Sequence, residues 1–445
     1  MTVIGIDDTD SRTEGMCTTF VAHTVAEELR DRGADVERIL LVRLNPGVEH
    51  KTRGNAALAV HTDVDPAVAS EVATTVVSDL AVVEDVETNP GVVVAHTVPD
   101  DVPDAVAEFA HCAVTDILEP GEAVSLADAH GFETHTWGNG RGIVGALAAV
   151  GAWAAFDDWT YEHITYRESD RWGSDRDVDD ASVLEAADDA YPAVWDTVDR
   201  GENEVVCVPR TPCPILFGIR GDDADTCERV AGAIESEPGT SGRTFVTNQG
   251  TDVHLNDATD APDASELEAG RAYRASGVVA RNPETRRGGH VFVPFAIGGP
   301  DADRDSADGR TPDVDEAPPE LELAAFEPTK RFRDHVRALH PGDAVTVCGE
   351  IADGTLKLEK FRVDDLVLAS RETPECPDCG RRMKSAGADQ GYRCRDCDTT
   401  APGKVDVPLD RDLELGWYEV PPRARRHVAK PLVRGGFAGP IHPER

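Results

Sequence analysis

Hydrophobic positions near the N-terminus alternate between strand-like runs and helix-like stripes. Residues 3–6 form an apolar run typical of a buried strand, and Val21, Val25 and Leu29 recur with helical spacing within residues 16–32. The same patterns predict further strands at 37–43, 56–62 and 91–96, and further helices at 66–80 and 101–113. Alternating strands and helices are typical of a layered domain that contains both.

The middle of the chain predicts a second, smaller unit. A glycine-rich turn at 138–142 precedes an apolar helix that runs to about residue 155. Residues 170–189 carry eight acidic residues and two arginines, which predicts a solvated loop and helix. Short hydrophobic runs predict an α+β unit with strands near 204–208, 214–219 and 243–247 and a helix near 223–236.

The residues that follow predict a small β-barrel. Residues 272–297 contain two strand-like runs, and two more runs, at 343–351 and 355–361, flank a turn at 352–354. Four or five short strands in about 100 residues favour an OB-fold. Residues 301–322 hold nine acidic residues, two arginines and three prolines, a composition that predicts a disordered insertion.

Four cysteines beyond the barrel predict a metal site. Cys376, Cys379, Cys394 and Cys397 form two C-x-x-C pairs with fourteen residues between them. Each pair can place two thiolates on one tetrahedral ion, so the spacing predicts a zinc ribbon. The alternatives are unrelated free thiols or a redox pair.

The net charge of the chain bears on whether it can bind nucleic acid. The 445 residues include 84 acidic and 44 basic side chains, for a formal net charge of -40. Such a charge ordinarily disfavours nucleic acid, whose phosphates repel carboxylates. Here the acids are spread over the whole chain and lysine is scarce, as in proteins of salt-loving archaea. At about 1 M salt the Debye length is about 3 Å, so local basic patches decide binding. The alternative is an acidic mesophilic protein that avoids nucleic acid.

Length and hydropathy predict the cellular setting. The length predicts about three domains, or four small ones. The sequence contains no apolar run of 18 residues and no signal peptide. We therefore expect a soluble, cytoplasmic protein whose thiols are reduced.

Three carboxylates follow the first predicted strand. Asp7, Asp8 and Asp10 lie where the chain must turn, and clustered carboxylates at a strand end suit a Mg²⁺ ion shared with nucleotide phosphates. The alternative is an acidic turn. The next helix begins near Gly15 and Thr18, where backbone N–H groups attract phosphate and the hydroxyl could accept a phosphoryl group or cap the helix.

Two further segments could contact phosphate. Arg43, Lys51 and Arg53 are the three cations of a loop between two strands, which could neutralise a polyphosphate or pair with surface acids. Gly140, Arg141 and Gly142 lie in a loop without the Gly-Lys-Ser ending of a Walker P-loop. Its glycines indicate a close backbone approach, either to phosphate or to a neighbouring strand.

Two segments in the second half carry polar or basic side chains. Residues 247–252, together with His254, are dense in hydrogen-bonding groups and could recognise a polar ligand or cap a turn. Residues 421–445 carry six cations and one acid. Such a tail could hold RNA phosphates, or it could be a disordered solubilising tail.

Together these motifs resemble the archaeal tRNA-isoleucine 2-agmatinylcytidine synthetase family. The resemblance begins with Gly-Ile-Asp-Asp-Thr-Asp-Ser, Gly-Met-Cys-Thr-Thr, Arg-Leu-Asn-Pro with Lys-Thr-Arg-Gly-Asn, and Arg-Gly-Ile-Val-Gly-Ala-Leu. It continues through Tyr-Glu at 161–162, Tyr-Arg at 166–167, Thr-Asn-Gln-Gly-Thr-Asp, Gly-Gly-His-Val and Glu-Pro-Thr-Lys. It ends with the cysteine pairs and Arg-Arg-His followed by Lys-Pro-Leu. The motifs cover nearly the whole chain in order.

The resemblance implies an ATP-dependent carbon–nitrogen ligase. The family attaches agmatine to C2 of the wobble cytidine in an isoleucine tRNA with the anticodon CAU, so that the tRNA reads AUA. The C2 oxygen is phosphorylated and then displaced by the agmatine amine. The implied cofactors are ATP, Mg²⁺ and Zn²⁺, and the implied partners are this tRNA and agmatine, with no membrane and no obligate protein partner.

The resemblance also implies roles for single residues. Asp7, Asp8 and Asp10 would hold Mg²⁺ against ATP, and Thr18 matches the family threonine that becomes phosphorylated. Lys51 and Arg53 would balance developing charge. The expected nucleotide contacts are Asp7, Asp8, Gly15, Thr18, Lys51, Gly140, Arg141 and Gly142.

The expected architecture is an α+β multidomain protein. We predict a kinase-like α/β domain at 1–130, a ferredoxin-like domain at 131–260, an OB-fold at 268–370 with an acidic insertion at 300–322, a zinc ribbon at 371–402 and a basic C-terminal tail at 403–445.

Two other functions compete with the ligase. One is a non-catalytic OB-fold and zinc-ribbon protein that binds single-stranded nucleic acid, and the other is an RNA kinase that stops at the phosphorylated base. A pure binding protein has no need of strand-end carboxylates beside a cationic loop, so the motifs before residue 260 favour an enzyme.

Overall fold

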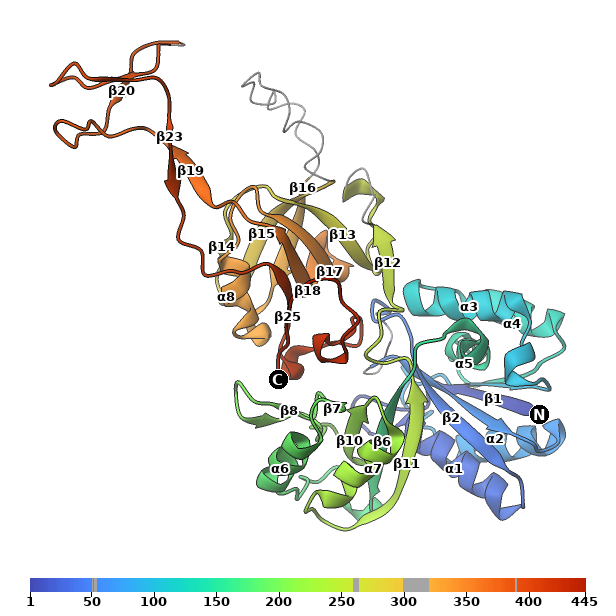
Figure 1. The fold of residues 1–445 in the computed structure, drawn as a ribbon. Helices are drawn as coiled ribbons and strands as arrows, with labels where there is room; N and C mark the ends of the chain where they lie inside the picture. The colour runs from blue at the N-terminus through green and yellow to red at the C-terminus, as the bar shows by residue number, and fades with distance from the viewer. Residues whose placement is uncertain (50, 52–53, 259–263, 299–319, 389) are drawn as a thin grey trace.

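Four structural parts follow one another along the chain. The computed structural model describes residues 1–49, 51, 54–258, 264–298, 320–388 and 390–445. A helix-covered sheet leads to a β-barrel, from which a cysteine-rich module extends outward (Figure 1). Most of the predicted acidic insertion lies outside the described residues.

The N-terminal part has a sheet between two layers of helices. Its elements are β1 (Thr2–Asp7), α1 (Thr18–Asp31), β2 (Val36–Arg43), β3 (Ala56–Thr62), α2 (Pro66–Leu80), β4 (Gly91–Ala95), α3 (Asp104–Thr115), α4 (Pro120–Ala129), β5 (Glu133–Thr136) and α5 (Ile143–Ala155). Helices α1 and α2 cover one face, and α3, α4 and α5 cover the other (Figure 1). Because strand side chains alternate, Val3 packs beneath α5 while Ile4 packs on the α1 side.

The second part has the ferredoxin-like order of elements. It consists of β6 (Thr160–Arg167), α6 (Asp180–Ala190), β7 (Val194–Trp195), β10 (Ile215–Gly221), α7 (Ala224–Ala233) and β11 (Gly239–Thr247), with a small ribbon of β8 (Val198–Asp199) and β9 (Glu204–Val205). The strand order β11-β6-β10-β7 is that of a βαββαβ unit, which confirms the predicted fold.

One continuous sheet joins these two parts. Strand β2 pairs in parallel with β11, with Leu40 opposite Val246, and this extends the sheet to nine strands in the order β5-β4-β1-β3-β2-β11-β6-β10-β7. Helix α5 packs on β1, β3 and β4 although it lies beyond the boundary expected at residue 130. The domain boundaries therefore remain predictions.

The third part is a closed five-stranded barrel with OB-fold topology. After β12 (Leu255–Ala258), its strands are β13 (Ala272–Val279), β15 (Val291–Ile297), β16 (Glu320–Ala325), β17 (Ala344–Ala352) and β18 (Thr355–Asp365). The pairing runs β13-β15-β16-β18-β17 and returns to β13, with α8 (Phe332–Arg337) between β16 and β17 and the short β14 (Glu284–Thr285) beside β15. Phe295, Phe332 and Phe361 are fully buried in its core. The OB-fold prediction is confirmed.

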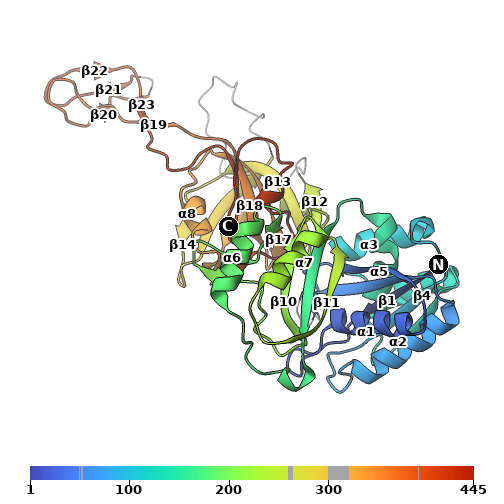
Figure 2. The same ribbon diagram turned by 60° about the horizontal axis from the view of Figure 1, so that its bottom comes forward.

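The cysteine-rich module extends from the barrel on two paired strands. These strands, β19 (Ala369–Glu372) and β23 (Val405–Pro408), lead to the short strands β20 (Lys384–Ser385), β21 (Tyr392–Arg393) and β22 (Thr400–Ala401). Both views show the module standing away from the rest of the molecule (Figures 1 and 2).

The chain after the module returns to the barrel. Strand β24 (Gly416–Glu419) pairs with β18, and β25 (Ile441–His442) pairs with β24. Residues 416–445 are therefore a folded part of the structure and not a disordered tail. None of the helices in the described parts of the chain combines the length and the apolar composition needed to cross a bilayer.

Candidate functional site

The predicted site residues gather at one large cavity. It has a volume of about 900 Å³ and opens where β1 and β2 end. Its walls come from the N-terminal part, the ferredoxin-like part and one residue of the C-terminal segment, His427. The predicted residues that line it are Asp7, Asp8, Asp10, Thr18, Lys51, Arg141 and Gly142.

Asp8 is held in a defined orientation at the end of β1. Its φ is 57°, a left-handed conformation that aspartate tolerates better than most residues. The Arg141 Nε donates to its Oδ2 over 2.9 Å, and the Asn89 backbone N–H donates to the same oxygen over 3.1 Å. Arg141 thus orders a carboxylate, in addition to the nucleotide contact expected from the sequence.

The electrostatics of the carboxylates favour a cation. Burial raises the pKa of Asp7 well above its usual range, and the nearby carboxylates of Asp8 and Asp10 raise it further. Burial also raises the pKa of Asp8, although the Arg141 guanidinium opposes this shift. A divalent cation among these oxygens would relieve the repulsion, so the donor set fits Mg²⁺.

The glycine-rich segment allows helix α5 to approach the strands. A Cβ on Gly142 would lie 2.6 Å from the Gly91 backbone N, and a Cβ on Gly145 would lie 2.0 Å from the Asp7 Oδ2. The glycines therefore serve a close approach to neighbouring strands, one of the two interpretations drawn from the sequence. Gly140 has a φ of 75° and is not among the residues that line the cavity.

Thr18 is the first residue of α1, which corrects the capping interpretation. The N-cap is Cys17, and no side chain caps the helix. The Thr18 hydroxyl instead accepts a hydrogen bond from Thr9 over 3.1 Å, and Thr18 lines the cavity. Gly15 is not a lining residue; its φ is 99°, and a Cβ there would lie 2.8 Å from the Pro212 carbonyl oxygen.

Lys51 reaches the cavity from the loop between β2 and β3. Its Nζ donates to the backbone oxygens of Pro46 and Val48, the latter over 3.1 Å. Burial lowers the pKa of Lys51. Arg53, predicted beside it, lies outside the described residues.

A charged cluster of Arg43, Glu162 and Arg220 also lines the cavity, and of these residues the sequence indicates only Arg43, as a cation of the loop after β2. Glu162 on β6 accepts from Arg43 Nη2 over 3.4 Å and from Arg220 Nε over 3.1 Å, and its side chain is only 5% exposed. Arg220 is its register partner on β10. The sequence signal for the other two residues is weak, because Glu162 lies in a motif of the family resemblance that carries no assigned role and Arg220 lies in none of the motifs.

Residues 247–252 hold Arg43 in that cluster. The Asn248 side chain accepts from the Arg43 backbone N–H and donates to its carbonyl oxygen, while the Gln249 Oε1 accepts from Arg43 Nε over 2.8 Å. His254 also contacts the Arg43 carbonyl oxygen, over 3.1 Å. This segment is therefore a structural clamp between β2 and β11.

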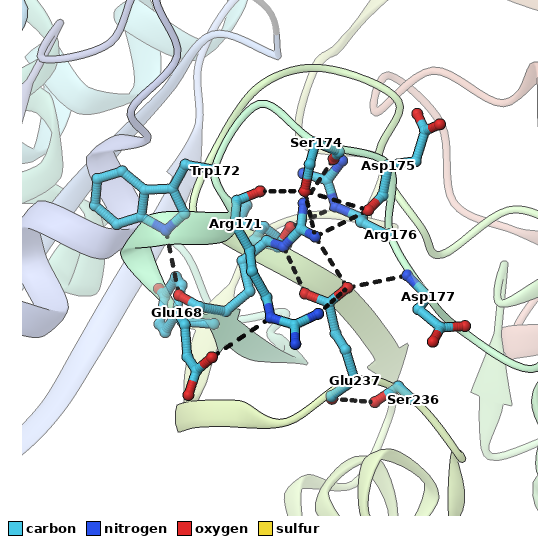
Figure 3. Close-up of polar contacts among 12 residues, drawn as sticks. Glu168, Arg171, Trp172, Ser174, Asp175, Arg176, Asp177, Ser236 and Glu237 are labelled. Atoms are coloured by element: carbon cyan, nitrogen blue, oxygen red, sulfur yellow. Dashed lines mark hydrogen bonds and ion pairs between the residues drawn. The ribbon is translucent and has the colours of Figure 1, made fainter.

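The acidic segment after β6 is tied to the cavity wall. Arg167 and Glu237, 0% and 1% exposed, form a buried ion pair, and Arg167 also donates to the Ser174 backbone. Glu237 also accepts from the Asp177 backbone N–H over 3.0 Å (Figure 3). Arg176 of the same loop donates to the carbonyl oxygens of residues 211, 213 and 215, in a segment that lines the cavity. The loop predicted to be solvated thus supports part of the site.

The C-terminal arginines are paired with acids from other parts of the chain. Arg434 contacts Asp158 over 3.1 Å and Asp222 over 2.5 Å, with only 8% of its side chain exposed. Arg425 is 7% exposed and contacts Asp196 and Glu419. These side chains are committed to the fold, which corrects their interpretation as free ligands for RNA phosphates.

The four cysteines lie together at the tip of the extended module. Their Sγ atoms all lie within 4.8 Å of one another, and those of Cys379 and Cys394 are 3.6 Å apart. Thiolates bound to zinc at about 2.3 Å would lie about 3.8 Å apart in a tetrahedron, so the four ligands fit one Zn²⁺ ion.

Comparisons with known proteins agree with this architecture. Three family models match: the TiaS TCKD domain at residues 3–65, the TiaS FLD domain at 140–254 and the TiaS C-terminal zinc ribbon domain at 373–413. A tRNA-isoleucine 2-agmatinylcytidine synthetase, TiaS, from Haloquadratum walsbyi is 51% identical, with 100% of both chains covered.

Solved structures extend the similarity to the whole fold. A TiaS complex with its isoleucine tRNA and ATP is 37% identical, with a TM-score of 0.84 over 100% of this chain and 99% of the other. A TiaS complex with the same tRNA, AMPCPP and agmatine is 34% identical, with a TM-score of 0.83 over the same shares. The chain belongs to the tRNA-isoleucine 2-agmatinylcytidine synthetase family.

Proposed function

We propose that this protein attaches agmatine to C2 of the wobble cytidine of the isoleucine tRNA with the anticodon CAU, at the expense of ATP. The observation that carries the proposal is the similarity over the full chain to complexes that hold an isoleucine tRNA, ATP or AMPCPP, and agmatine. The modified tRNA then reads AUA. The enzyme works in the cytoplasm, where its tRNA substrate is found.

The chemistry requires an activated oxygen. ATP supplies a phosphoryl group to the C2 oxygen, and the agmatine nitrogen then bonds to C2 while phosphate leaves with that oxygen. Phosphoryl transfer depends on positioning and on neutralising charge, and a single cavity lined both by the carboxylates after β1 and by Arg43 and Arg220 supports both. The cytidine reaches the cavity by leaving the anticodon stack, which a single-stranded loop permits at low energetic cost.

The carboxylates at the end of β1 form the nucleotide side of the cavity. Asp7, Asp8 and Asp10 would hold Mg²⁺, which when bound neutralises and orients the ATP phosphates. Arg141 keeps the Asp8 carboxylate in place, and the Thr18 hydroxyl, also in the wall, is the phosphoryl acceptor that the family resemblance implies.

Cations balance the charge that develops during transfer. Lys51 can do so once its ammonium exchanges the carbonyl oxygens of its own loop for phosphate oxygens. Arg53 follows it closely in the chain and is proposed for the same role. Gly15 and Gly140 contribute through backbone shape beside the cavity, and Gly142 brings the start of α5 to its wall.

An incorporation assay tests the proposal. Protein loaded with zinc is incubated in concentrated KCl with ATP, labelled agmatine and an unmodified transcript of the CAU-anticodon isoleucine tRNA. We expect ATP-dependent label in the tRNA, and no label when the wobble cytidine is replaced by uridine.

The competing functions give different results in the same assay. Labelled phosphate on the tRNA without agmatine would indicate an RNA kinase. Tight tRNA binding without ATP consumption would indicate a non-catalytic binding protein.

A further inference from the structure

Residues 425–430, here named the brace, lie where the barrel meets the nine-stranded sheet (Figure 1). At its start, the Arg425 guanidinium contacts Asp196, just after β7, and Glu419 of β24, the latter over 2.9 Å. The exposed fractions of these three side chains are 7%, 6% and 2%. An arginine this enclosed cannot reach an RNA phosphate without leaving both partners.

The next residue fixes the brace to the barrel. Arg426 contacts Glu350 of β17 and Glu359 of β18, each over 2.5 Å, and its backbone N–H donates to Glu359 over 3.2 Å. Side chain and main chain are therefore both anchored to the barrel.

The far end of the brace is held by a shared carboxylate. Asp252 accepts the Lys430 backbone N–H over 2.7 Å and the Lys360 Nζ over 2.8 Å, and it also pairs with Arg274 over 3.0 Å. Asp252 belongs to the segment that clamps Arg43, so the brace is connected to the cavity wall at this end as well.

Between these anchors, His427 enters the wall of the cavity. It lines the cavity together with Arg43, Glu162 and Arg220. Burial lowers the pKa of His427 well below its usual range, and the cations Arg43 and Arg220, with His254, lower it further. A neutral imidazole offers one acceptor nitrogen and one N–H donor to a bound substrate.

We propose that the brace is part of the reaction centre, with Arg425 and Arg426 as positioning residues that hold His427 where it contacts bound substrate. The inference rests on the proposed function and gives the basic charges of this segment a role other than tRNA binding. On this proposal, packing of the barrel against the sheet also places His427 in the cavity wall and so completes the cavity.

Kinetics separate positioning from RNA binding. We expect Arg425→Gln and His427→Ala to lower kcat at least about tenfold while the tRNA Kd stays within about twofold, because the proposal gives neither side chain a contact with the RNA backbone. Arg425→Lys, which keeps the charge but loses the fork geometry, should be intermediate. The matched control is Arg423→Gln, which removes an equal charge from a more exposed arginine outside the brace and should leave kcat and Kd within about twofold.

Equal weakening of tRNA binding by Arg425→Gln and Arg423→Gln, with kcat unchanged, would overturn the proposal. Should Arg425→Gln fail to fold, His427→Ala decides, since it removes one half-buried ring and none of the anchors; an unchanged kcat for it is an overturning result.

A second readout does not depend on turnover. The ¹³C-labelled His427 imidazole, assigned by its loss in His427→Ala, should titrate at a higher pH in Arg425→Lys than in the wild type, because a looser anchor lets the ring move toward solvent and away from Arg43 and Arg220. An identical response in both proteins would contradict the role of Arg425. Absence of agmatine incorporation by the wild type would instead contradict the proposed function.

Discussion

At the scale of single residues, two adjacent carboxylates at the end of β1 have different surroundings. Asp8 accepts from Arg141 and from a backbone N–H, which orient it. Asp7 lies against the start of α5, where Gly145 leaves it room. We infer that Asp8 supplies an ordered ligand and that Asp7 supplies the ligand whose pKa is raised more, so a bound cation would favour its charged form.

Replacing Asp8 tests the metal-binding role. Asp8→Asn keeps the size and the left-handed tolerance of the residue but removes its charge, so ATP consumption should fall at least about 100-fold while the tRNA Kd is unchanged. The control, Glu71→Gln on the exposed face of α2, should leave both unaffected. An equal loss of ATP use and tRNA binding in Asp8→Asn would contradict the role.

His61 is a buried histidine outside the site whose ring stabilises the fold poorly. It is fully buried on β3, and neither ring nitrogen has a hydrogen-bond partner within the described chain. Burial, together with Arg38, lowers the pKa of His61 to about 3. In the unfolded chain the His61 imidazole has a pKa near 6.5, so between about pH 6.5 and pH 3 it is protonated in the unfolded state but not in the folded state. The free energy of unfolding therefore falls as the pH drops from about 6.5 toward 3.

His61→Leu should remove that penalty. We expect the variant to gain about 2 kcal/mol relative to the wild type at pH 5, on top of any difference at pH 7.5. Urea unfolding at the two pH values, at constant high salt, measures the gain. A stability difference that is the same at both values would show that His61 is not the titrating group.

At the scale of elements, helix α5 shapes the site through two kinds of close contact. A Cβ on Gly145 would meet the end of the Asp7 side chain, which can move aside. A Cβ on Gly5 of β1 would meet the Ala146 backbone oxygen at 2.0 Å, which cannot move without shifting the helix. Gly145 thus leaves room for a carboxylate of the site, and Gly5 allows the close packing of α5 on β1.

Alanine substitutions should separate these two effects. Gly145→Ala should lower ATP use at least about tenfold with little change in Tm, because it displaces only the ends of two side chains, the Asp7 carboxylate and a Leu44 methyl group. Gly5→Ala should lower Tm strongly. Gly121→Ala on α4, where a Cβ meets nothing within 4 Å, should stabilise the protein by about 0.5–1 kcal/mol. A Gly145→Ala enzyme with full activity would contradict the assignment of Asp7.

Helices and strands with a clear hydrophobic periodicity could be predicted from the sequence. Features that depend on contacts between residues far apart in the chain could not. The apolar α5, the N-terminal strands and the barrel belong to the first group. Strand β6 was missed because polar residues alternate along it, and one of them, Glu162, faces the cavity. The carboxylates of the site could be predicted because they are adjacent in sequence. The Glu162–Arg220 pair depends on strand register, which local patterns do not contain.

The partners of the C-terminal arginines could not be predicted either, because they are also distant in sequence. Arg425 and Asp196 are 229 residues apart in the chain, so the sequence shows a basic segment but not the acids that neutralise it. Charge patterns predict the surface of a protein well only when the opposite charges are also local.

At the scale of the molecule, the cysteine module is an appendage with few contacts to the barrel. Its own small cluster consists of Cys376, Met383 and Cys394, packed with Tyr392 and Ala401. So small a cluster cannot hold a module together alone, and the metal supplies the remaining stability.

Removing one thiolate should therefore unfold the module and leave the other parts intact. We expect Cys394→Ser to bind no zinc, to lose amide protection only within residues 373–413, and to keep the thermal transition of the barrel and the sheet. Zinc analysis and hydrogen exchange check this. A zinc content of one per chain in the variant would exclude the four-cysteine site.

The ladder between β2 and β11 has a mechanical consequence. Backbone hydrogen bonds join the strand that ends at Arg43 to the strand that ends at Thr247. The N-terminal part and the ferredoxin-like part therefore cannot rotate apart as two hinged domains without breaking these hydrogen bonds. Opening and closing around substrates must then involve the parts that surround this sheet, such as the boundary along which the barrel packs. Product release in this enzyme should therefore depend on movements of the parts around the sheet and not on movements within it.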